Sequence, residues 1–347
     1  MLLFAFFWIS QLVPDAANVD FKQPQITASQ NLVALTFGGS SAVYFSASRD
    51  QGRTFSRPVK VGEAGVLALG RHRGPRIAIT SRAIVISAIV GEQGKGKDGD
   101  LVSWRSTDGG RTWLKGPVIN DRPNAAREGL HGMAAGPDGL LYAVWLDDRA
   151  GGKEVYGAYS DDGGATWSKN VRIYHSPDGH VCECCHPSVL VGNGGKVYVM
   201  WRNWLGGSRD FYVARSDDGG RTFQEAEKLG VGTWKLNACP MDGGGLALTR
   251  EGTLVSVWRR QDQIFLTKGE GAETRIDAGK DPALAIGREG LYLVWTNPSG
   301  VYARVPGKTE PVALDAEGGY AQLAALPGGQ IAAVWESKGA IRFETLR

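Results

Sequence analysis

Short apolar segments recur along the whole chain, and most of them close on a tryptophan or another large apolar side chain. They are rich in β-branched residues and follow turns that contain glycine or asparagine, such as Gly-Pro-Asp-Gly at residues 136–139. A short apolar run behind a turn signal is typical of a buried β-strand, and no helical period interrupts the series. The pattern therefore predicts an all-β chain with repeated strands at residues 33–37, 86–90, 141–145, 197–201, 254–258, 291–295 and 331–335.

A second repeat, Ser-x-Asp-x-Gly-x-Thr followed by an aromatic residue, lies between these strands. Its copies occupy residues 48–55, 106–113, 160–167 and 216–223. In such a turn the aspartate accepts backbone amides, the glycine takes a positive φ, and the aromatic ring packs between sheets. This motif is the Asp-box, and four copies in matching register resemble the blades of a sialidase-type β-propeller. The resemblance covers residues 21–347 and implies that fold.

The number of repeats predicts the number of blades. Seven repeated strands predict a seven-bladed propeller, and the six-bladed arrangement of familiar sialidases is the alternative. The last repeat, residues 321–346, supplies only three strands, so we expect the segment near residues 19–23 to add the fourth. That strand would close the ring and remove an open sheet edge. No linker-like change of composition appears, so residues 18–347 are expected to form a single domain.

The N-terminus resembles a signal peptide. Residues 2–13 are almost wholly apolar and are followed by Pro-Asp-Ala-Ala, a small-residue cleavage pattern. The positive start of a signal peptide is absent, because the first basic residue is Lys22. We expect residues 1–17 to be a signal peptide and the protein to be secreted or periplasmic. The apolar stretch is too short to span a bilayer, so no stable membrane insertion is expected.

Charge argues against one class of partner. The formal net charge is +3, and no run of lysine and arginine forms a basic stripe. Nucleic-acid binding depends on such a stripe, so no nucleic-acid partner is expected. The sequence carries no signal for an oligomeric state.

The five histidines and four cysteines are confined to one kind of position in the repeat. They lie in connections between blades or at the first residues of the predicted innermost strands. The Asp-boxes mark turns of the other face, so this distribution predicts a functional face opposite to them. Equivalent positions at the mouth of a propeller converge on one pocket. Counting back from the strand ends selects Arg76, His131 and Pro187, fourteen residues before Val90, Trp145 and Trp201, and Tyr320, fifteen before Trp335.

The sialidase resemblance implies roles for several of these residues. Gly74-Pro75-Arg76-Ile77 is similar to the first sialidase blade, whose arginine binds the substrate carboxylate, although here a full blade precedes it and no proline follows Ile77. The last blade resembles the one that carries the tyrosine nucleophile of sialidases, an exception to the two-carboxylate rule of glycosidases. The implied function is an exo-α-sialidase-like glycoside hydrolase that acts on or recognises glycans and requires no cofactor. The implied residues are Tyr320 as nucleophile, Asp98 or Asp100 as acid/base and Arg76 as the carboxylate-binding arginine. The glutamate expected beside the tyrosine has no clear match: Glu183 is the candidate in the cysteine loop, and Glu336 is interpreted as a blade-end surface residue. The further substrate-binding arginines would come from Arg202, Arg209, Arg259 or Arg260, among which the sequence does not choose, and His131, selected by its spacing, is another candidate for substrate binding.

Residues 175–187 hold three cysteines and three histidines. One interpretation is two disulfides, with Cys239 as the partner on the next connection and three connectivities open. Another is a copper or zinc site, because thiolate and imidazole ligands suit both metals. The segment also contains the c-type haem pattern Cys-x-x-Cys-His, and a nucleophilic thiol is a fourth interpretation. The candidate metal ligands are Cys182, Cys184, Cys185, His186 and Cys239.

These interpretations leave more than one function open. Besides the glycan-acting enzyme, the loop supports a metal-binding or redox propeller without glycosidase activity. A propeller whose face is locked by disulfides and serves as an interaction scaffold is the third hypothesis. Fold alone does not choose among them.

Overall fold

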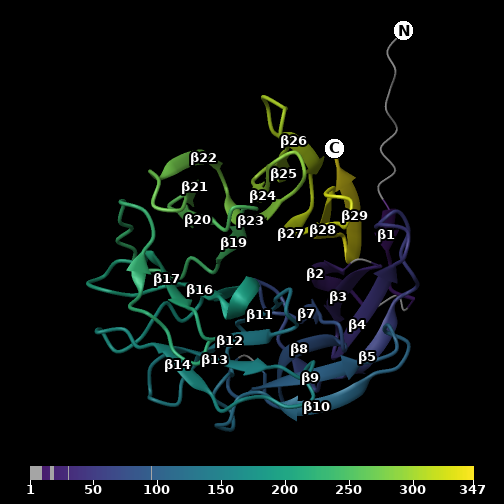
Figure 1. The fold of residues 1–347 in the computed structure, drawn as a ribbon, viewed down its shortest axis with the longest axis horizontal. Helices are drawn as coiled ribbons and strands as arrows, with labels where there is room; N and C mark the ends of the chain where they lie inside the picture. The colour runs from purple at the N-terminus through teal and green to yellow at the C-terminus, as the bar shows by residue number, and fades with distance from the viewer. Residues whose placement is uncertain (1–9, 16–18, 30, 95) are drawn as a thin grey trace.

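Seven antiparallel sheets form a ring of blades in the computed structural model of the protein (Figure 1). The structure describes residues 10–15, 19–29, 31–94 and 96–347. The first strands of consecutive blades contact one another around the ring, and those of the first and last blades meet. The predicted all-β, seven-bladed propeller is therefore confirmed, and the six-bladed alternative is wrong. Among the described residues there is no helix with the length and apolar character needed to cross a membrane.

The first four blades run outwards from the innermost strand in chain order. Blade 1 contains β2 (Phe21–Ser29), β3 (Leu32–Gly39), β4 (Ala42–Ser48) and β5 (Val59–Glu63). Blade 2 contains β7 (Arg76–Ile79), β8 (Ile84–Gly91), β9 (Asp100–Ser106) and β10 (Leu114–Val118), with β6 (Val66–Leu67) also paired to β8. Blade 3 contains β11 (His131–Ala135), β12 (Leu141–Asp147), β13 (Glu154–Ser160) and β14 (Val171–Tyr174). Blade 4 contains β15 (Ser188–Val191), the 3₁₀ turn η1 (Asn193–Gly195), β16 (Val197–Arg202), β17 (Phe211–Ser216) and β18 (Glu227–Lys228).

The last three blades repeat this order. Blade 5 contains β19 (Gly244–Leu248), β20 (Leu254–Arg260), β21 (Gln263–Lys268) and β22 (Thr274–Ala278). Blade 6 contains β23 (Lys280–Ile286), β24 (Leu291–Asn297), β25 (Gly300–Arg304) and β26 (Val312–Asp315). Blade 7 contains β27 (Gly319–Ala325), β28 (Ile331–Ser337), β29 (Ala340–Leu346) and, as its outermost strand, β1 (Ser10–Leu12).

The N-terminus closes the ring, but not with the predicted segment. Residues 19–23 were expected to complete the last blade, whereas Phe21 begins β2, the innermost strand of blade 1. The fourth strand of blade 7 is β1, whose Leu12 pairs with Ile341 of β29 and is buried. The reason is geometric, because a strand must fill the space between the inner strands of blades 7 and 2. The strand that fills it is β2, which contacts β27 on one side and β7 on the other. Residues 1–9 and 16–18 of the predicted signal peptide and its cleavage region lie outside the described residues.

Aromatic side chains fill the space between neighbouring blades. The aromatic residue of an Asp-box packs on the blade before it, as Trp113 does on Phe45, with ring centroids 5.1 Å apart. Rings of this size bury large apolar areas, which makes them effective wedges between twisted sheets. The predicted repeated strands lie in the second strand of each blade, and most of them end in a buried tryptophan: Trp145, Trp201, Trp258, Trp295 and Trp335.

The Asp-boxes form the turns between the third and fourth strands of blades 1–4, as predicted. In blade 3, Asp162 Oδ1 accepts the backbone amides of Ala165 at 2.9 Å and Thr166 at 3.0 Å, and Thr166 Oγ1 donates to Oδ2 at 2.6 Å. Ser160 Oγ donates to the same carboxylate and accepts the Gly164 amide at 2.9 Å. Burial opposes ionisation of Asp162, but the Thr166 hydrogen bonds outweigh it and lower the pKa from 3.8 to about 2. The motif is thus a hydrogen-bonded turn.

We expect Asp162→Ala to lower the free energy of unfolding by about 1–3 kcal/mol, because it leaves the turn amides without their acceptor. Denaturant unfolding monitored by tryptophan fluorescence measures this. The pKa is lower in the folded state, so the carboxylate stabilises the fold above pH 3.8, and this contribution is lost as the pH falls towards 2.

Asp161→Ala is the matched control, because Asp161 is exposed and makes no hydrogen bond to another described residue. It should leave stability within about 0.5 kcal/mol of the wild type. Equal stability of the two variants would contradict the structural role of the Asp-box.

Candidate functional site

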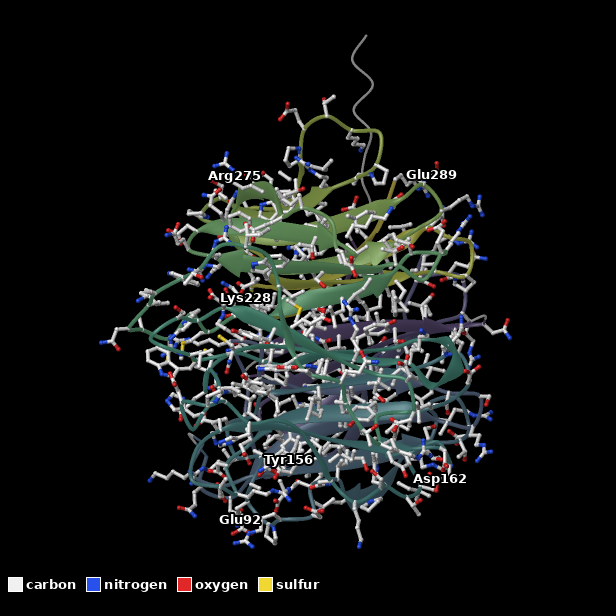
Figure 2. The ribbon with its side chains drawn as sticks, turned by 60° about the vertical axis from the view of Figure 1, so that its left-hand side comes forward. Glu92, Tyr156, Asp162, Lys228, Arg275 and Glu289 are labelled. Carbon is white, nitrogen blue, oxygen red and sulfur yellow. The ribbon has the colours of Figure 1, made fainter. Side chains whose placement is uncertain are left out.

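The face that the sequence predicts to be functional, which carries the starts of the blades, lies opposite the Asp-boxes. The Asp-box turn follows the third strand of a blade, and the first strand runs in the same direction as the third. The first strand therefore ends at the Asp-box face and begins at the opposite face. Figure 2 shows the two sides: Asp162 and Glu289, both in turns of the Asp-box face, lie to the right, and Glu92, in a loop between second and third strands, lies to the left. The start of each inner strand therefore lies at one mouth of the ring.

Four residues from blades 2, 4, 6 and 7 meet at this mouth, and we call them the mouth cluster: His72, His186, Asp281 and Tyr320. The His72 ring stacks on His186 with centroids 4.5 Å apart and meets the edge of Tyr320 at 5.1 Å. His72 Nε2 lies 2.7 Å from Asp281 Oδ1, and both side chains are buried. Segments up to 248 residues apart in the printed sequence thus form one polar centre.

Unusual backbone conformations hold these side chains in place. His72, Asp281 and Tyr320 have φ values of 66°, 54° and 54°, in the left-handed region that non-glycine residues rarely occupy. Such strain concentrates at functional sites, where the surrounding structure maintains it. His186 is held from the other side, because any side chain at Gly243 would collide with its ring.

A small pocket of about 290 Å³ opens beside the cluster, between blades 6, 7 and 1. Burial raises the pKa of Glu336, whose Oε2 accepts the Gln23 amide at 2.6 Å. Burial would also raise the pKa of Asp281, but the charge and hydrogen bond of His72 outweigh it and lower that pKa. Burial raises the pKa of Tyr320, with Asp281 and Glu336 adding to the effect. The small pocket is lined by these three groups and by Lys22, Lys280 and Lys338.

A larger pocket of about 660 Å³ adjoins the mouth on the side of blades 2 and 3. Its wall is mainly apolar, and it also contains Arg71 and Asp98. Arg71 precedes His72 in a tight turn in which the Arg73 amide donates to Gly70 O at 3.1 Å. The turn therefore separates the two pockets, with Arg71 lining the larger one and His72 contacting Tyr320 of the smaller one.

Arg76 and His131 are buried supports rather than pocket walls. Arg76 Nη2 donates to His72 O at 2.7 Å and Nη1 to Gly74 O at 3.1 Å, so it fixes the turn that carries His72. Burial lowers its pKa to about 10. His131 Nε2 lies 3.0 Å from Ser87 Oγ, and burial lowers the pKa of this imidazole well below its usual value. The two positions also differ in register. Arg76 pairs with the third residue after the one that pairs with the Asp-box serine, whereas His131 pairs with the fourth residue after its equivalent.

The predicted acid/base residues do not lie with Tyr320. Asp98 lines the larger pocket, where the amides of Glu92 and Gln93 donate to it and lower its pKa. Asp100 Oδ1 accepts Asn120 Nδ2 at 2.7 Å and the Asn124 amide at 2.6 Å. Glu183 is exposed in the cysteine loop. The carboxylate beside Tyr320 is instead Glu336, which is half-buried in the small pocket rather than on the blade surface.

The predicted substrate-binding arginines each have a partner within the fold. Buried Arg202 donates to Asp242 Oδ1 at 2.7 Å, and Arg259 lies 3.3 Å from Oδ2 of the same aspartate. Arg260 pairs with Glu273 at 2.7 Å. Arg209 Nη1 lies 3.1 Å from Cys182 Sγ. These guanidinium groups therefore do not converge on a common carboxylate site.

Three cysteines cluster in the loop that joins blades 3 and 4. Cys182 Sγ lies 3.2 Å from Cys185 Sγ and 3.8 Å from Cys184 Sγ, and all three side chains are buried. Hydrogen bonds from Cys184 and Cys185 lower the pKa of Cys182, aided by Arg202 and Arg209. Cys239 is exposed and lies outside this group, and the described cysteines are all unpaired. The predicted five-residue ligand set is thus brought together only in part, because the ring of His186 faces His72 instead.

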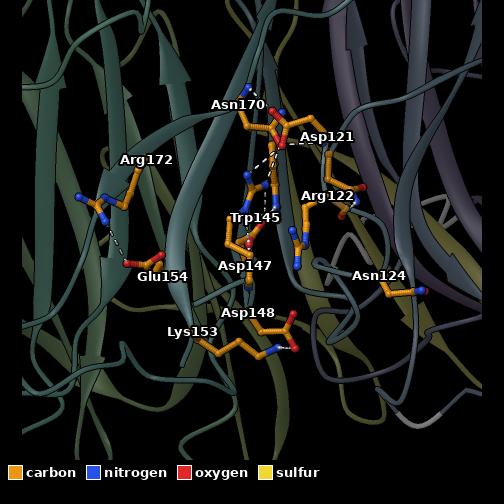
Figure 3. Close-up of polar contacts among 12 residues, drawn as sticks. Asp121, Arg122, Asn124, Trp145, Asp147, Asp148, Lys153, Glu154, Asn170 and Arg172 are labelled. Atoms are coloured by element: carbon orange, nitrogen blue, oxygen red, sulfur yellow. Dashed lines mark hydrogen bonds and ion pairs between the residues drawn. The ribbon is translucent and has the colours of Figure 1, made fainter. Parts of the chain in front are cut away.

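A second polar network, at the boundary of blades 2 and 3, is structural (Figure 3). Arg149 donates to Asp147 and Asp121, each at 2.8 Å, and to Asn170 at 2.9 Å. Trp145 Nε1 donates to the other oxygen of Asp147 at 2.8 Å. These bonds tie the loop after β12 to the connection that precedes β11, which stabilises the functional face.

Sequence reasoning missed His72, Asp281 and Glu336 as site residues. The spacing rule could have found Asp281, because it lies fourteen residues before Trp295 and the same spacing selected His131. His72 stands outside the repeat, in a turn before β7, so no spacing rule finds it. The hydrogen-bond partner of Glu336 is the Gln23 amide, 313 residues away. No local sequence pattern therefore indicates that Glu336 is partly buried at the mouth.

Comparisons with known proteins agree with this fold. Residues 149–306 match the family model of the BNR repeat-like domain. No curated protein sequence matches the chain. At TM-score 0.59 and 15% identity, a catalytically inactive virginiamycin B lyase from Staphylococcus aureus, solved with quinupristin, covers 98% of this chain and 100% of its own.

Two glycan-related structures are similar as well. An α-L-arabinanase from Penicillium chrysogenum, complexed with arabinobiose, has a TM-score of 0.55 and 16% identity over 97% of both chains. The Hadza microbial sialidase Hz136 has a TM-score of 0.57 and 16% identity over 94% of this chain, which spans 66% of that longer protein. At such identities the likeness concerns the fold. The chain is therefore a seven-bladed β-propeller that matches the BNR repeat-like domain over residues 149–306 and is similar in fold to a sialidase.

Proposed function

We propose that the protein hydrolyses glycosidic bonds of glycans at the mouth of the propeller, in the small pocket. One observation carries the proposal: Asp281 and Glu336 line the same pocket, and their environments move their pKa values in opposite directions. A pair of carboxyl groups tuned in this way is the usual basis of acid/base catalysis in glycoside hydrolases. The glycan-acting propellers with a similar fold support the substrate class.

The pKa directions assign a role to each group. Glu336, with a raised pKa, is the general acid that protonates the leaving oxygen. Asp281, held ionised by His72, is the carboxylate that activates water or attacks the anomeric carbon. Tyr320 keeps its proton because its pKa is raised, so it acts as a neutral hydrogen-bond donor rather than as the nucleophile that the resemblance implied.

The lining of the two pockets indicates how a glycan would lie. Three lysines, Lys22, Lys280 and Lys338, and three carboxyl groups, Asp281, Glu317 and Glu336, line the small pocket, and such a polar lining suits the hydroxyl groups of a sugar. The larger pocket is wide and mainly apolar beside Arg71, and its size suits the rest of an oligosaccharide. The bond to be cleaved would then lie near the turn that carries Arg71 and His72.

Export belongs to the same proposal, since glycans of this kind are met outside the cytoplasm. The apolar residues 2–13 support it, whereas the pairing of Leu12 in blade 7 gives part of that stretch a place in the fold. N-terminal sequencing of protein recovered from the culture medium or periplasm tests whether the signal peptide is cleaved. A start near residue 18 supports cleavage, and retention of residues 10–12 contradicts it.

We expect Glu336→Gln and Asp281→Asn each to lower kcat on aryl glycosides by about 10²–10⁴-fold, because each removes one half of the acid/base pair. A panel of anionic and neutral aryl glycosides measures this and identifies the preferred sugar. Tyr320→Phe should weaken catalysis less, since only a hydrogen-bond donor is lost.

Glu344→Gln is the matched control. Glu344 lies in the same blade, is partly buried and also has a pKa raised by burial, but it lies away from the small pocket. Its kcat should equal that of the wild type. Absence of hydrolysis by the wild type across the whole panel would end the proposal.

The pH dependence of kcat/KM tests the assignment of roles. A general acid works only while protonated, so activity should fall as the pH rises through the raised pKa of Glu336, above its usual 4.5. A second loss is expected at acid pH, below the usual 3.8 of aspartate, where Asp281 becomes protonated. Residual activity of Glu336→Gln should lack the alkaline limb, and an unchanged limb in that variant would contradict its role as the acid.

A further inference from the structure

We propose that Cys182, Cys184 and Cys185 bind one thiophilic metal ion in three-coordinate geometry, the arrangement that suits Cu(I). The three Sγ atoms lie within 4.8 Å of one another and are buried. The site is distinct from the small pocket, and the inference does not depend on the proposed hydrolase activity.

The sulfur positions are close to those that a bound ion requires. A metal about 2.3 Å from each of three sulfurs in one plane would separate them by about 4.0 Å. Cys182 Sγ lies 3.8 Å from Cys184 Sγ and 3.2 Å from Cys185 Sγ. Side-chain shifts of a few tenths of an ångström would therefore complete a trigonal site.

The surrounding charges favour a monovalent ion. Three thiolates and the buried carboxylate of Asp242, 3.9 Å from Cys185 Sγ, would bring four negative charges together. Three arginines meet this group: Arg202 and Arg259 pair with Asp242, and Arg209 Nη1 lies 3.1 Å from Cys182 Sγ. Asp262, the second partner of Arg259, is exposed, so solvent screens its charge and it lies outside this buried group. Within the buried group one positive charge remains to be supplied, and a single Cu(I) ion supplies it. The desolvation cost of a buried charge makes this balance decisive.

The available ligands point the same way. Zinc in structural sites takes four ligands, but both oxygens of Asp242 already accept guanidinium hydrogen bonds. The ring of His186 stacks on His72 and lies outside the sulfur group. The thioether of Met241 also packs on the cysteines, but its sulfur accepts a hydrogen bond from Arg71 Nη1 at 2.6 Å, which leaves the three cysteine sulfurs as the ligands. Thiolate and thioether sulfur are the soft ligands that select Cu(I).

A disulfide between Cys182 and Cys185 is the competing chemistry, because their sulfur atoms are the closest pair. The metal site and the disulfide differ in whether they require the sulfur of Cys184. A trigonal metal site needs its sulfur, whereas a disulfide between its neighbours does not. Cys184→Ser therefore separates them.

The test is an anaerobic titration of the reduced full-length protein with Cu(I) against a competing chromophoric chelator, followed by X-ray absorption at the copper edge. We expect one equivalent of Cu(I) with three sulfur neighbours and no nitrogen or oxygen ligand. Cys184→Ser should weaken binding by more than about 100-fold, beyond the loss expected for a residue that only supports a ligand. Arg209→Gln should weaken it by about 10–100-fold.

Cys239→Ser is the matched control, because Cys239 is exposed and outside the cluster, and it should bind Cu(I) like the wild type. Circular dichroism and thermal unfolding identify any variant that fails to fold. If Cys184→Ser fails to fold, Arg209→Gln, which keeps all three sulfurs, tests the site in its place. Wild-type affinity in Cys184→Ser, or a four-coordinate zinc ion as the sole tightly bound metal, would overturn the proposal. So would a wild-type protein that is purified 2 Da lighter than its reduced mass, binds no Cu(I) after reduction, and links Cys182 to Cys185.

Discussion

Closure of the ring is the constraint on which the rest of the structure depends. Each blade buries its faces only against its two neighbours, so the sheets must complete the circle before any of them is covered on both sides. Aromatic wedges such as Trp145 and Trp335 fill the space between blades, and β1 pairs with β29 to complete the last one. The same closure brings the first residues of all inner strands to one mouth. The mouth cluster is therefore a consequence of the topology.

The mouth concentrates polar groups where solvent is scarce, and this sets their chemistry. His72 and Asp281, 209 residues apart, form a buried hydrogen-bonded pair, and Glu336 lines the same pocket as Asp281. Desolvation raises the pKa of both carboxyl groups, and it is outweighed only at Asp281, where the contact with His72 favours the ionised form. The strained backbone at His72, Asp281 and Tyr320 is maintained by the packing around it.

The cysteine loop and the small pocket share a face but have different hydrogen-bonding partners. Arg202, Asp242 and Arg259 lie beside the sulfur atoms as one buried ion network, and they satisfy one another across the boundary of blades 4 and 5. The arginines that a sialidase resemblance would assign to a substrate carboxylate are thereby used to support the loop. The lysines of the small pocket likewise have carboxylate partners, Lys22 with Asp20, Lys280 with Asp281 and Lys338 with Glu317. The two proposed sites can therefore be tested independently.

Local pattern determined the repeating part of this protein. Strands, Asp-box turns and seven blades follow from residue types that recur at short range, because hydrogen-bonded turns such as that of Asp162 are complete within a few residues. The common face of the blade starts was also predictable, since chain direction alone places every blade start on the same side. The partners at the mouth were not: Glu336 meets the Gln23 amide, and His72 reaches Asp281, only after the ring closes. Only the tertiary structure decided that Arg76 is a buried support and that Cys239 stands apart from the other cysteines, because burial and long-range pairing leave no trace in local spacing.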